Sequence, residues 1–292
     1  MIGGGDVNRL HNELPALTEP RPAAPASSQR RFSFSRIWWW LVFIAGFLYF
    51  FLPLLGTLEF SLRAIPSGSA YTNSLADPKF AATLGFSFVI GIITIIVSML
   101  IIVPTAFWVR LKLPRWRPIV EFITLLPFVM PPIVLVFGLV NTYSRPPLPL
   151  TNTDFGSNVL LVAAYVVLSF PYMYRAVDTG LRAIDVQSLT EASQSLGAGW
   201  VRLLWEVILP NLRVALLSGA FLTLAIVVGE FTIATFLYRP TFGPYLSLLG
   251  GNKAYEPAAV SLISFGLTWL AMGIISLIGR SGPGRVIVAG AR

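Results

Sequence analysis

The chain has 292 residues, of which 55% are hydrophobic and only 12% are charged, with a net charge of +8. A soluble globular domain carries about 25% charged residues, so a soluble protein of this length could not cover its surface with so few. Cysteine is absent and His11 is the only histidine. This excludes disulfides, cysteine-bound metals and a catalytic thiol, and we expect no metal site and no catalytic group in this chain.

The N-terminal residues differ from the rest of the chain. Residues 1–36 hold four prolines, mixed charges and small residues, a composition typical of a flexible segment. A signal peptide is not expected, because the polar stretch is too long and no small-residue cleavage site follows the first apolar run. We therefore predict a cytoplasmic N-terminal tail over 1–36, a membrane domain over 37–280 and a cytoplasmic C-terminal tail over 281–292.

Six apolar runs dominate the chain from residue 37 onward. Runs of about 18 or more apolar residues predict transmembrane helices, and long runs separated by loops indicate helices rather than a barrel. The sequence therefore predicts an all-α membrane protein with six transmembrane helices, at Ile37–Leu58, Phe80–Val109, Phe122–Ser144, Phe155–Tyr174, Val214–Tyr238 and Pro257–Gly279.

The basic residues predict the orientation. Sixteen of the 21 Lys and Arg residues fall on one side if the N-terminus is cytoplasmic, and five fall on the other. Positive residues collect on the cytoplasmic side, so we predict that both termini are cytoplasmic. The positive excess then sets topology and indicates no nucleic-acid partner.

The connection between the fourth and fifth spans, about residues 182–212, is the longest polar one. Ser188-Leu-Thr-Glu191 matches a capping box, which predicts that a helix begins at Ser188, and Gly197 can end it. A second amphipathic helix follows before Pro210 breaks it. Its predicted apolar face consists of Val201, Leu204, Trp205 and Ile208.

This loop resembles the EAA motif of bacterial ABC importer permeases. The family pattern is Glu-Ala-Ala, three residues, Gly, nine residues, Ile, one residue and Leu-Pro, and the spacing here agrees throughout. Ser193 and Val207 differ conservatively from it. The matching residues are Glu191-Ala192-Ser193, Gly197 and Val207-Ile-Leu209-Pro210, with Pro171, Arg175 and Gly229-Glu230-Phe231 as further points of similarity.

The resemblance implies a type I ABC importer permease of six helices in the bacterial cytoplasmic (inner) membrane. Its partners would be two cytoplasmic ABC ATPase subunits, a second permease (the same or a homologous chain) and an external solute-binding protein. ATP and Mg would bind to the ATPase, because this chain has no G-x-x-x-x-G-K-[ST] motif. The loop would couple ATP hydrolysis to transport through Glu191, Ala192, Ser193, Gly197, Ala198, Leu209 and Pro210.

Glu230 is the only ionisable residue well inside a predicted span, where a charge is costly. On a continuous helix it would share a face with Gly219, Thr223, Ile226 and Ala234. That face would either line the solute path or pack against a neighbouring helix, and the sequence favours neither. Asn141 and Tyr143, near the outer end of the third span, are further candidates for solute contact.

Proline-rich positions interrupt the third span at Pro127 and Pro131-Pro132. They indicate either an ordinary kink, which we favour, or a break in the path.

The stretch after Gly229 is similar to permeases of the polyamine subgroup, so a polyamine or similar small polar solute is the expected substrate. The alternatives are an importer of sulfate, phosphonate, iron, thiamine or a sugar. An ion-coupled secondary transporter would show paired intramembrane acids or broken helices in two related halves. A membrane-embedded enzyme would need clustered catalytic polar groups, which the spans lack.

Overall fold

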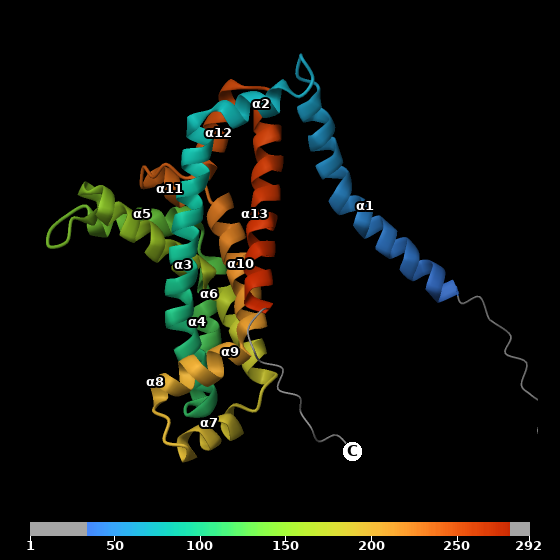
Figure 1. Cartoon of the computed structure of the whole chain (residues 1–292). Coiled ribbons are helices and arrows are strands. Elements are labelled where there is room, and N and C mark those ends of the chain that lie inside the picture. The colour runs from blue at the N-terminus through green and yellow to red at the C-terminus, as the bar shows by residue number, and fades with distance from the viewer. Residues whose placement is uncertain (1–33, 281–292) are drawn as a thin grey trace, which may run out of the picture. The chain divides into compact units, whose positions relative to one another are not determined.

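The structure is a computed structural model that describes the backbone of residues 34–280 and the side chains of residues 38–277. The predicted flexible tails lie outside these residues, apart from the first turn of α1. The predicted all-α class is confirmed, since residues 34–280 contain helices and turns and no strand (Figure 1). The elements are α1 (Phe34–Leu62), α2 (Ser69–Ala76), α3 (Pro78–Leu111), η1 (Pro114–Trp116), α4 (Arg117–Val129), α5 (Pro132–Tyr143), η2 (Leu150–Asn152), α6 (Asp154–Arg182), α7 (Val186–Ser195), α8 (Trp200–Arg202), the π-helical turn η3 (Leu203–Ile208), α9 (Leu209–Asn211), α10 (Arg213–Gly229), α11 (Thr232–Phe236), α12 (Phe242–Asn252) and α13 (Glu256–Arg280).

Among the described residues, four helices are long and apolar enough to cross a membrane, and two bent helix pairs bring the number to as many as six. The single helices are α1, α3, α6 and α13. One bent pair joins α4 to α5 at 96°, and the other joins residues 200–211 to α10 at 79°. A total of six spans is therefore compatible with the structure, but the third is a bent pair, and the fifth is counted by pairing α10 with residues 200–211, which were predicted to belong to the coupling loop.

The expectation that Phe122–Ser144 forms one helix with an ordinary kink is wrong. α4 ends at Val129, Met130 is extended (φ −87°, ψ 118°), and α5 begins at Pro132. A residue that precedes a proline is driven out of the helical region, and proline has no N–H to donate. Two consecutive prolines therefore end the helix instead of bending it.

The core lies where α3, α6 and α10 pack together. Phe107, Met173 and Leu224 come from these three helices and are almost fully buried. At Gly219 of α10, an added Cβ would lie 2.7 Å from the sulfur of Met173 on α6, so the absent side chain permits a close helix contact. Small residues have this role in membrane helix packing.

Residues 34–50 of α1 belong to a separate compact unit, which ends at Phe50. Every side chain described in this part is exposed, including Trp38, Trp39 and Trp40. A helix that is apolar on all sides is suited to lipid.

Within the unit that contains residues 51–280, α7, α8 and α9 gather at one end, which we call the coupling end (Figure 1). The last turns of α13 reach the same end, because Met272 and Ser276 line a hollow together with Arg213 at the start of α10. The cytoplasmic orientation of this end remains a prediction.

Candidate functional site

The helix of the coupling loop, α7, begins two residues earlier than the capping-box pattern predicts. Asp185 is its N-cap, and the Asp185 carboxylate accepts hydrogen bonds from the Ser188 backbone N–H (3.1 Å) and the Ser188 hydroxyl (2.7 Å). Ser188 therefore donates to the cap and is not the cap itself. These hydrogen bonds favour the charged carboxylate and lower the pKa of Asp185 below its usual 3.8.

The end of α7 is as predicted. Gly197 has φ +79°, its N–H donates to the Gln194 carbonyl (2.9 Å), and the Ala198 N–H donates to the Ser193 carbonyl (3.0 Å). These bonds satisfy carbonyls that the last helical turn would otherwise leave free. A side chain at this φ would be strained, so the glycine of the motif is required by the turn.

The second helical stretch of the loop runs from α8 through the turn η3 to α9. Its predicted apolar face is wrong in part, because Val201 and Trp205 are exposed while Leu203 and Ile208 are fully buried. The π-helical turn places buried residues five positions apart, whereas the prediction assumed a regular α-helix. The buried face is held against α3, where the rings of Trp200 and Trp108 are 4.7 Å apart.

The motif residues divide into an exposed and a packed set. Glu191 and Ala192 are exposed, and the Glu191 carboxylate accepts a hydrogen bond from the Gln187 amide (2.9 Å). Ser193 and Ala198 are half-buried, and the Ser193 hydroxyl donates to the Leu189 carbonyl. Leu209 packs against the core, whereas Pro210 is exposed within α9.

Two large apolar side chains frame the exposed motif. Leu196 is 89% exposed and Val201 is 71% exposed, on either side of the Gly197 turn. We call the exposed side chains of Glu191, Ala192, Leu196 and Val201 the coupling surface.

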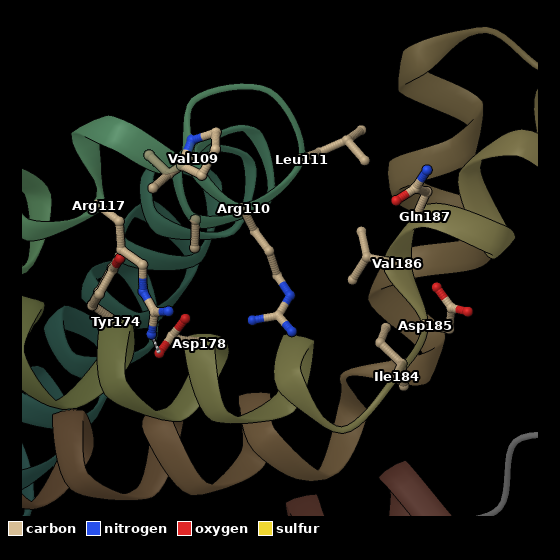
Figure 2. Close-up of a pocket in the computed structure, with 12 residues that line it drawn as sticks. Val109, Arg110, Leu111, Arg117, Tyr174, Asp178, Ile184, Asp185, Val186 and Gln187 are labelled. Carbon is tan, nitrogen blue, oxygen red and sulfur yellow. Dashed lines mark hydrogen bonds and ion pairs between the residues drawn. The ribbon is translucent and has the colours of Figure 1, made fainter.

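Behind α7 lies a cavity of about 370 Å³ (Figure 2). The last turn of α3, η1, the end of α6 and the start of α7 form its walls, and the Arg110 side chain points into it. This cavity places the first turn of α7 beside the connection between α3 and α4.

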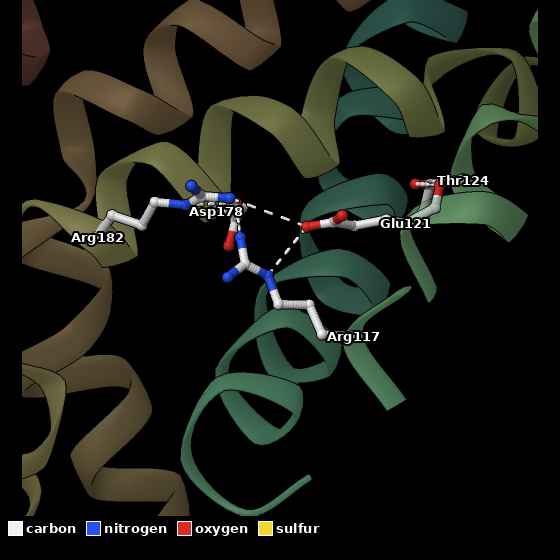
Figure 3. Close-up of polar contacts among 5 residues, drawn as sticks. All are labelled: Arg117, Glu121, Thr124, Asp178 and Arg182. Carbon is white, nitrogen blue, oxygen red and sulfur yellow. Dashed lines mark hydrogen bonds and ion pairs between the residues drawn. The ribbon is translucent and has the colours of Figure 1, made fainter. Parts of the chain in front are cut away.

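A four-residue ion-pair cluster joins α4 to α6 next to this cavity (Figure 3). Arg117 binds the carboxylates of Glu121 (2.9 Å) and Asp178 (3.2 Å), and Arg182 binds those of Asp178 (2.6 Å) and Glu121 (3.8 Å). This cluster is not among the sites predicted from the sequence. The signal available in the sequence was the two i,i+4 pairs, Arg117–Glu121 and Asp178–Arg182.

Glu230 ends a helix instead of lying within one. α10 stops at Gly229, Glu230 is extended (φ −74°, ψ 131°), and its carboxylate accepts hydrogen bonds from the N–H groups of Ile233 (2.9 Å) and Ala234 (3.2 Å). The Tyr165 hydroxyl of α6 donates to the same carboxylate (3.0 Å). The expected helical face that included both Thr223 and Ala234 is therefore wrong, because these residues lie on different helices.

The other expected path residues are dispersed. Thr223 is fully buried in α10, Asn141 is exposed near the end of α5, and Tyr143 is half-buried there. Within the described residues, no hydrogen bond joins any of them to Glu230.

Comparisons with known proteins identify the family. Residues 81–281 match the family described as "Binding-protein-dependent transport system inner membrane component". The chain belongs to this family. The predicted resemblance to ABC importer permeases and the multi-pass location in the inner membrane are thereby confirmed.

Curated relatives of this permease carry different substrate names. It is 32% identical to a probable molybdenum ABC transporter permease from Haloferax volcanii, in an alignment that covers 79% of this chain and 84% of that protein. It is 27% identical to the spermidine/putrescine permease PotB of Haemophilus influenzae, with 72% of this chain and 78% of PotB covered. It is also 28% identical to PhnV, a putative 2-aminoethylphosphonate permease of Salmonella typhimurium, with 77% of this chain and 87% of PhnV covered.

Among solved structures, a chain titled "Crystal structure of an amino acid ABC transporter with histidines" aligns with a TM-score of 0.48 and 17% identity. The alignment covers 70% of the permease and 94% of that chain.

Permeases of this family transport solutes and are not themselves catalytic. In the permease, residues 38–277 contain no group of three or more carboxylate or histidine side chains that could hold a metal ion.

Proposed function

We propose that this permease forms half of the translocation path of an ATP-driven importer and receives the ATPase movement through the coupling surface. The observation that carries the proposal is the exposure of Glu191 and Ala192 of the EAA motif, together with that of Leu196 and Val201 on either side of the turn at Gly197. Its partners would be two ATPase subunits that bind ATP and Mg²⁺, a second permease and an external solute-binding protein.

The contacts of α7 support a mechanical route into the membrane. Only three residues separate α7 from α6, and the ion-pair cluster joins α6 to α4. A displacement of α7 would therefore move α6 and α4 together, as in rigid-body switching between two states of access.

The relatives' names cover molybdenum, spermidine or putrescine, and 2-aminoethylphosphonate. We propose that the substrate is a small polar, charged solute. A polyamine, the substrate expected from sequence, is one candidate within this class.

Charge reversal at Glu191 tests the coupling role. In proteoliposomes that contain the complete importer, Glu191→Lys should lower ATP-driven uptake by about tenfold or more, because it replaces the carboxylate of the proposed docking contact with a cation. Glu206→Lys is the matched control, since Glu206 is exposed on the same loop but occupies one of the nine positions at which the motif specifies no residue type. Unchanged assembly and uptake in Glu191→Lys would contradict the assignment.

A further inference from the structure

Two adjoining hollows open on the side of the permease formed by α4, α6 and α10. One has a volume of about 750 Å³ and the other about 470 Å³. They share four lining residues, Leu125, Pro171, Arg175 and Thr179. A solute that moves along this side of the permease would therefore pass Arg175.

Arg175 differs from the other arginines near this place. It lies seven residues before the end of α6, which is about 10 Å along the helix axis. Its side chain is exposed to both hollows, and among the described residues it has no hydrogen bond and no ion pair. Arg117 and Arg182, by contrast, are both bound to carboxylates.

Two acids, Glu121 and Asp178, and two arginines, Arg175 and Arg182, line the smaller hollow, and Arg117 lies beside it and binds both acids. Glu121 and Asp178 are engaged by Arg117 and Arg182, so that the cluster of four is neutral. Arg175 remains as one uncompensated positive charge. A lone guanidinium in a polar hollow is suited to bind a carboxylate, phosphonate or other oxyanion through two parallel N–H donors.

The acid that could favour a cation is already engaged. The Glu230 carboxylate accepts hydrogen bonds from Tyr165, Ile233 and Ala234. The Glu230 carboxylate is therefore bound within the protein, whereas Arg175 has no partner among residues 38–277. The larger hollow is lined mainly by apolar side chains, such as Phe128 and Leu222, and the polar groups of Thr179, Asn211 and Ser218 lie among them.

We propose that Arg175 contacts the solute and that this solute carries an anionic group, such as a phosphonate or a tetrahedral oxyanion. This inference rests on the proposed importer function and narrows its substrate class. The competing explanation is that Arg175 extends to anionic lipid headgroups at the membrane surface.

The absence of cysteine makes a charge-rescue experiment possible, because Arg175→Cys creates the only thiol in the chain. The solute is first chosen by thermal stabilisation of the binding protein with molybdate, 2-aminoethylphosphonate, sulfate, spermidine and putrescine. Uptake of that solute is then measured in proteoliposomes without anionic lipid, with a complete importer made free of other cysteines. Arg115→Cys is the matched control, since Arg115 is exposed, has no partner among the described residues and lines neither hollow.

We expect an anion to stabilise the binding protein. Arg175→Cys should lower the uptake of this anion by about tenfold to a hundredfold, the usual effect of losing a hydrogen bond to a charged group. A thiol reagent that adds an ammonium group should restore most of the uptake, and one that adds a sulfonate should not. Arg115→Cys should transport within about twofold of the parent with either reagent, as expected for an exposed site.

Three results would overturn the inference. In the first, only spermidine or putrescine stabilises the binding protein. In the second, Arg175→Cys takes up the solute as fast as the parent does. In the third, the ammonium reagent and the sulfonate reagent restore uptake equally. Failure of the parent importer to couple ATP hydrolysis to uptake of any of the five solutes would overturn the proposed function as well. The parent and variant measurements therefore separate the two failures.

Discussion

In the coupling loop and at the break between α10 and α11, which we call the break at Glu230, polar groups end a helix. The two places differ in how far apart in sequence the bonded residues are. In the loop, the bonds join near neighbours, such as Asp185 with Ser188 and Gly197 with Gln194. At the break, Tyr165 reaches Glu230 across 65 residues of sequence. Gly243 also packs against the Glu230 carbonyl so closely that a Cβ there would be 2.2 Å from its oxygen. The two ends of α7 are thus defined locally, whereas the break depends on the folded bundle.

This contrast predicts that the largest loss of stability will follow from Glu230→Ala. The change leaves the Tyr165 hydroxyl and the N–H groups of Ile233 and Ala234 without their acceptor. Unsatisfied donors away from water cost about 1–3 kcal/mol each, so we expect a loss of about 2–5 kcal/mol in all. Thermal unfolding of the purified permease in detergent measures it.

Two milder variants separate the contacts at the break. Tyr165→Phe removes one donor and leaves the cap of α11 in place, so it should cost about 1 kcal/mol. Glu230→Gln keeps one acceptor oxygen and should lie between these two changes. Equal stability of Glu230→Ala and the unsubstituted permease would contradict a structural role for this carboxylate.

The same contrast explains which features could be predicted from sequence. The six apolar runs, the end of α7 at Gly197 and the exposure of Glu191 follow from local composition and glycine chemistry. The break at Glu230 could not be predicted, because its carboxylate is satisfied by Tyr165 on another helix and by a short helix that lies beyond it. The π-helical turn at Leu203–Ile208 was also missed, since a regular 3.6-residue period was assumed for its apolar face.

A smaller effect is expected at the turn of the coupling loop. Gly197→Ala places a Cβ at φ +79°, which costs about 1–2 kcal/mol in the left-handed region. Because the turn positions Leu196 and Val201, we expect weaker binding of the ATPase by about fivefold to thirtyfold. Affinity of the reconstituted permease for the ATPase, measured by titration, tests this.

Gly199→Ala is the matched control for the turn. Gly199 has φ −74°, and nothing lies within 4 Å of an added Cβ, so alanine fits without strain. Equal losses at Gly197 and Gly199 would show that the loop tolerates no side chain at all, and would remove the argument from backbone conformation.

The smallest effect concerns the cap of α7 and depends on pH. The pKa of Asp185 is lowered by its bonds to Ser188, so the stabilisation is complete above the usual value of 3.8. It is lost as pH falls through the lowered pKa. Protection of α7 amides from hydrogen exchange, corrected for the intrinsic rate, should therefore fall as pH decreases below the usual pKa of 3.8.

Asp185→Asn keeps a good N-cap but cannot titrate, so its α7 protection should stay constant over the same range. Glu206→Gln removes a different exposed acid of the loop and should retain the pH dependence of the unsubstituted permease. A parallel loss of protection in the Asp185→Asn variant would assign the effect to other acids. A loss confined to proteins that carry Asp185 would place the pH response of the coupling loop at a single local contact, in contrast to the break at Glu230.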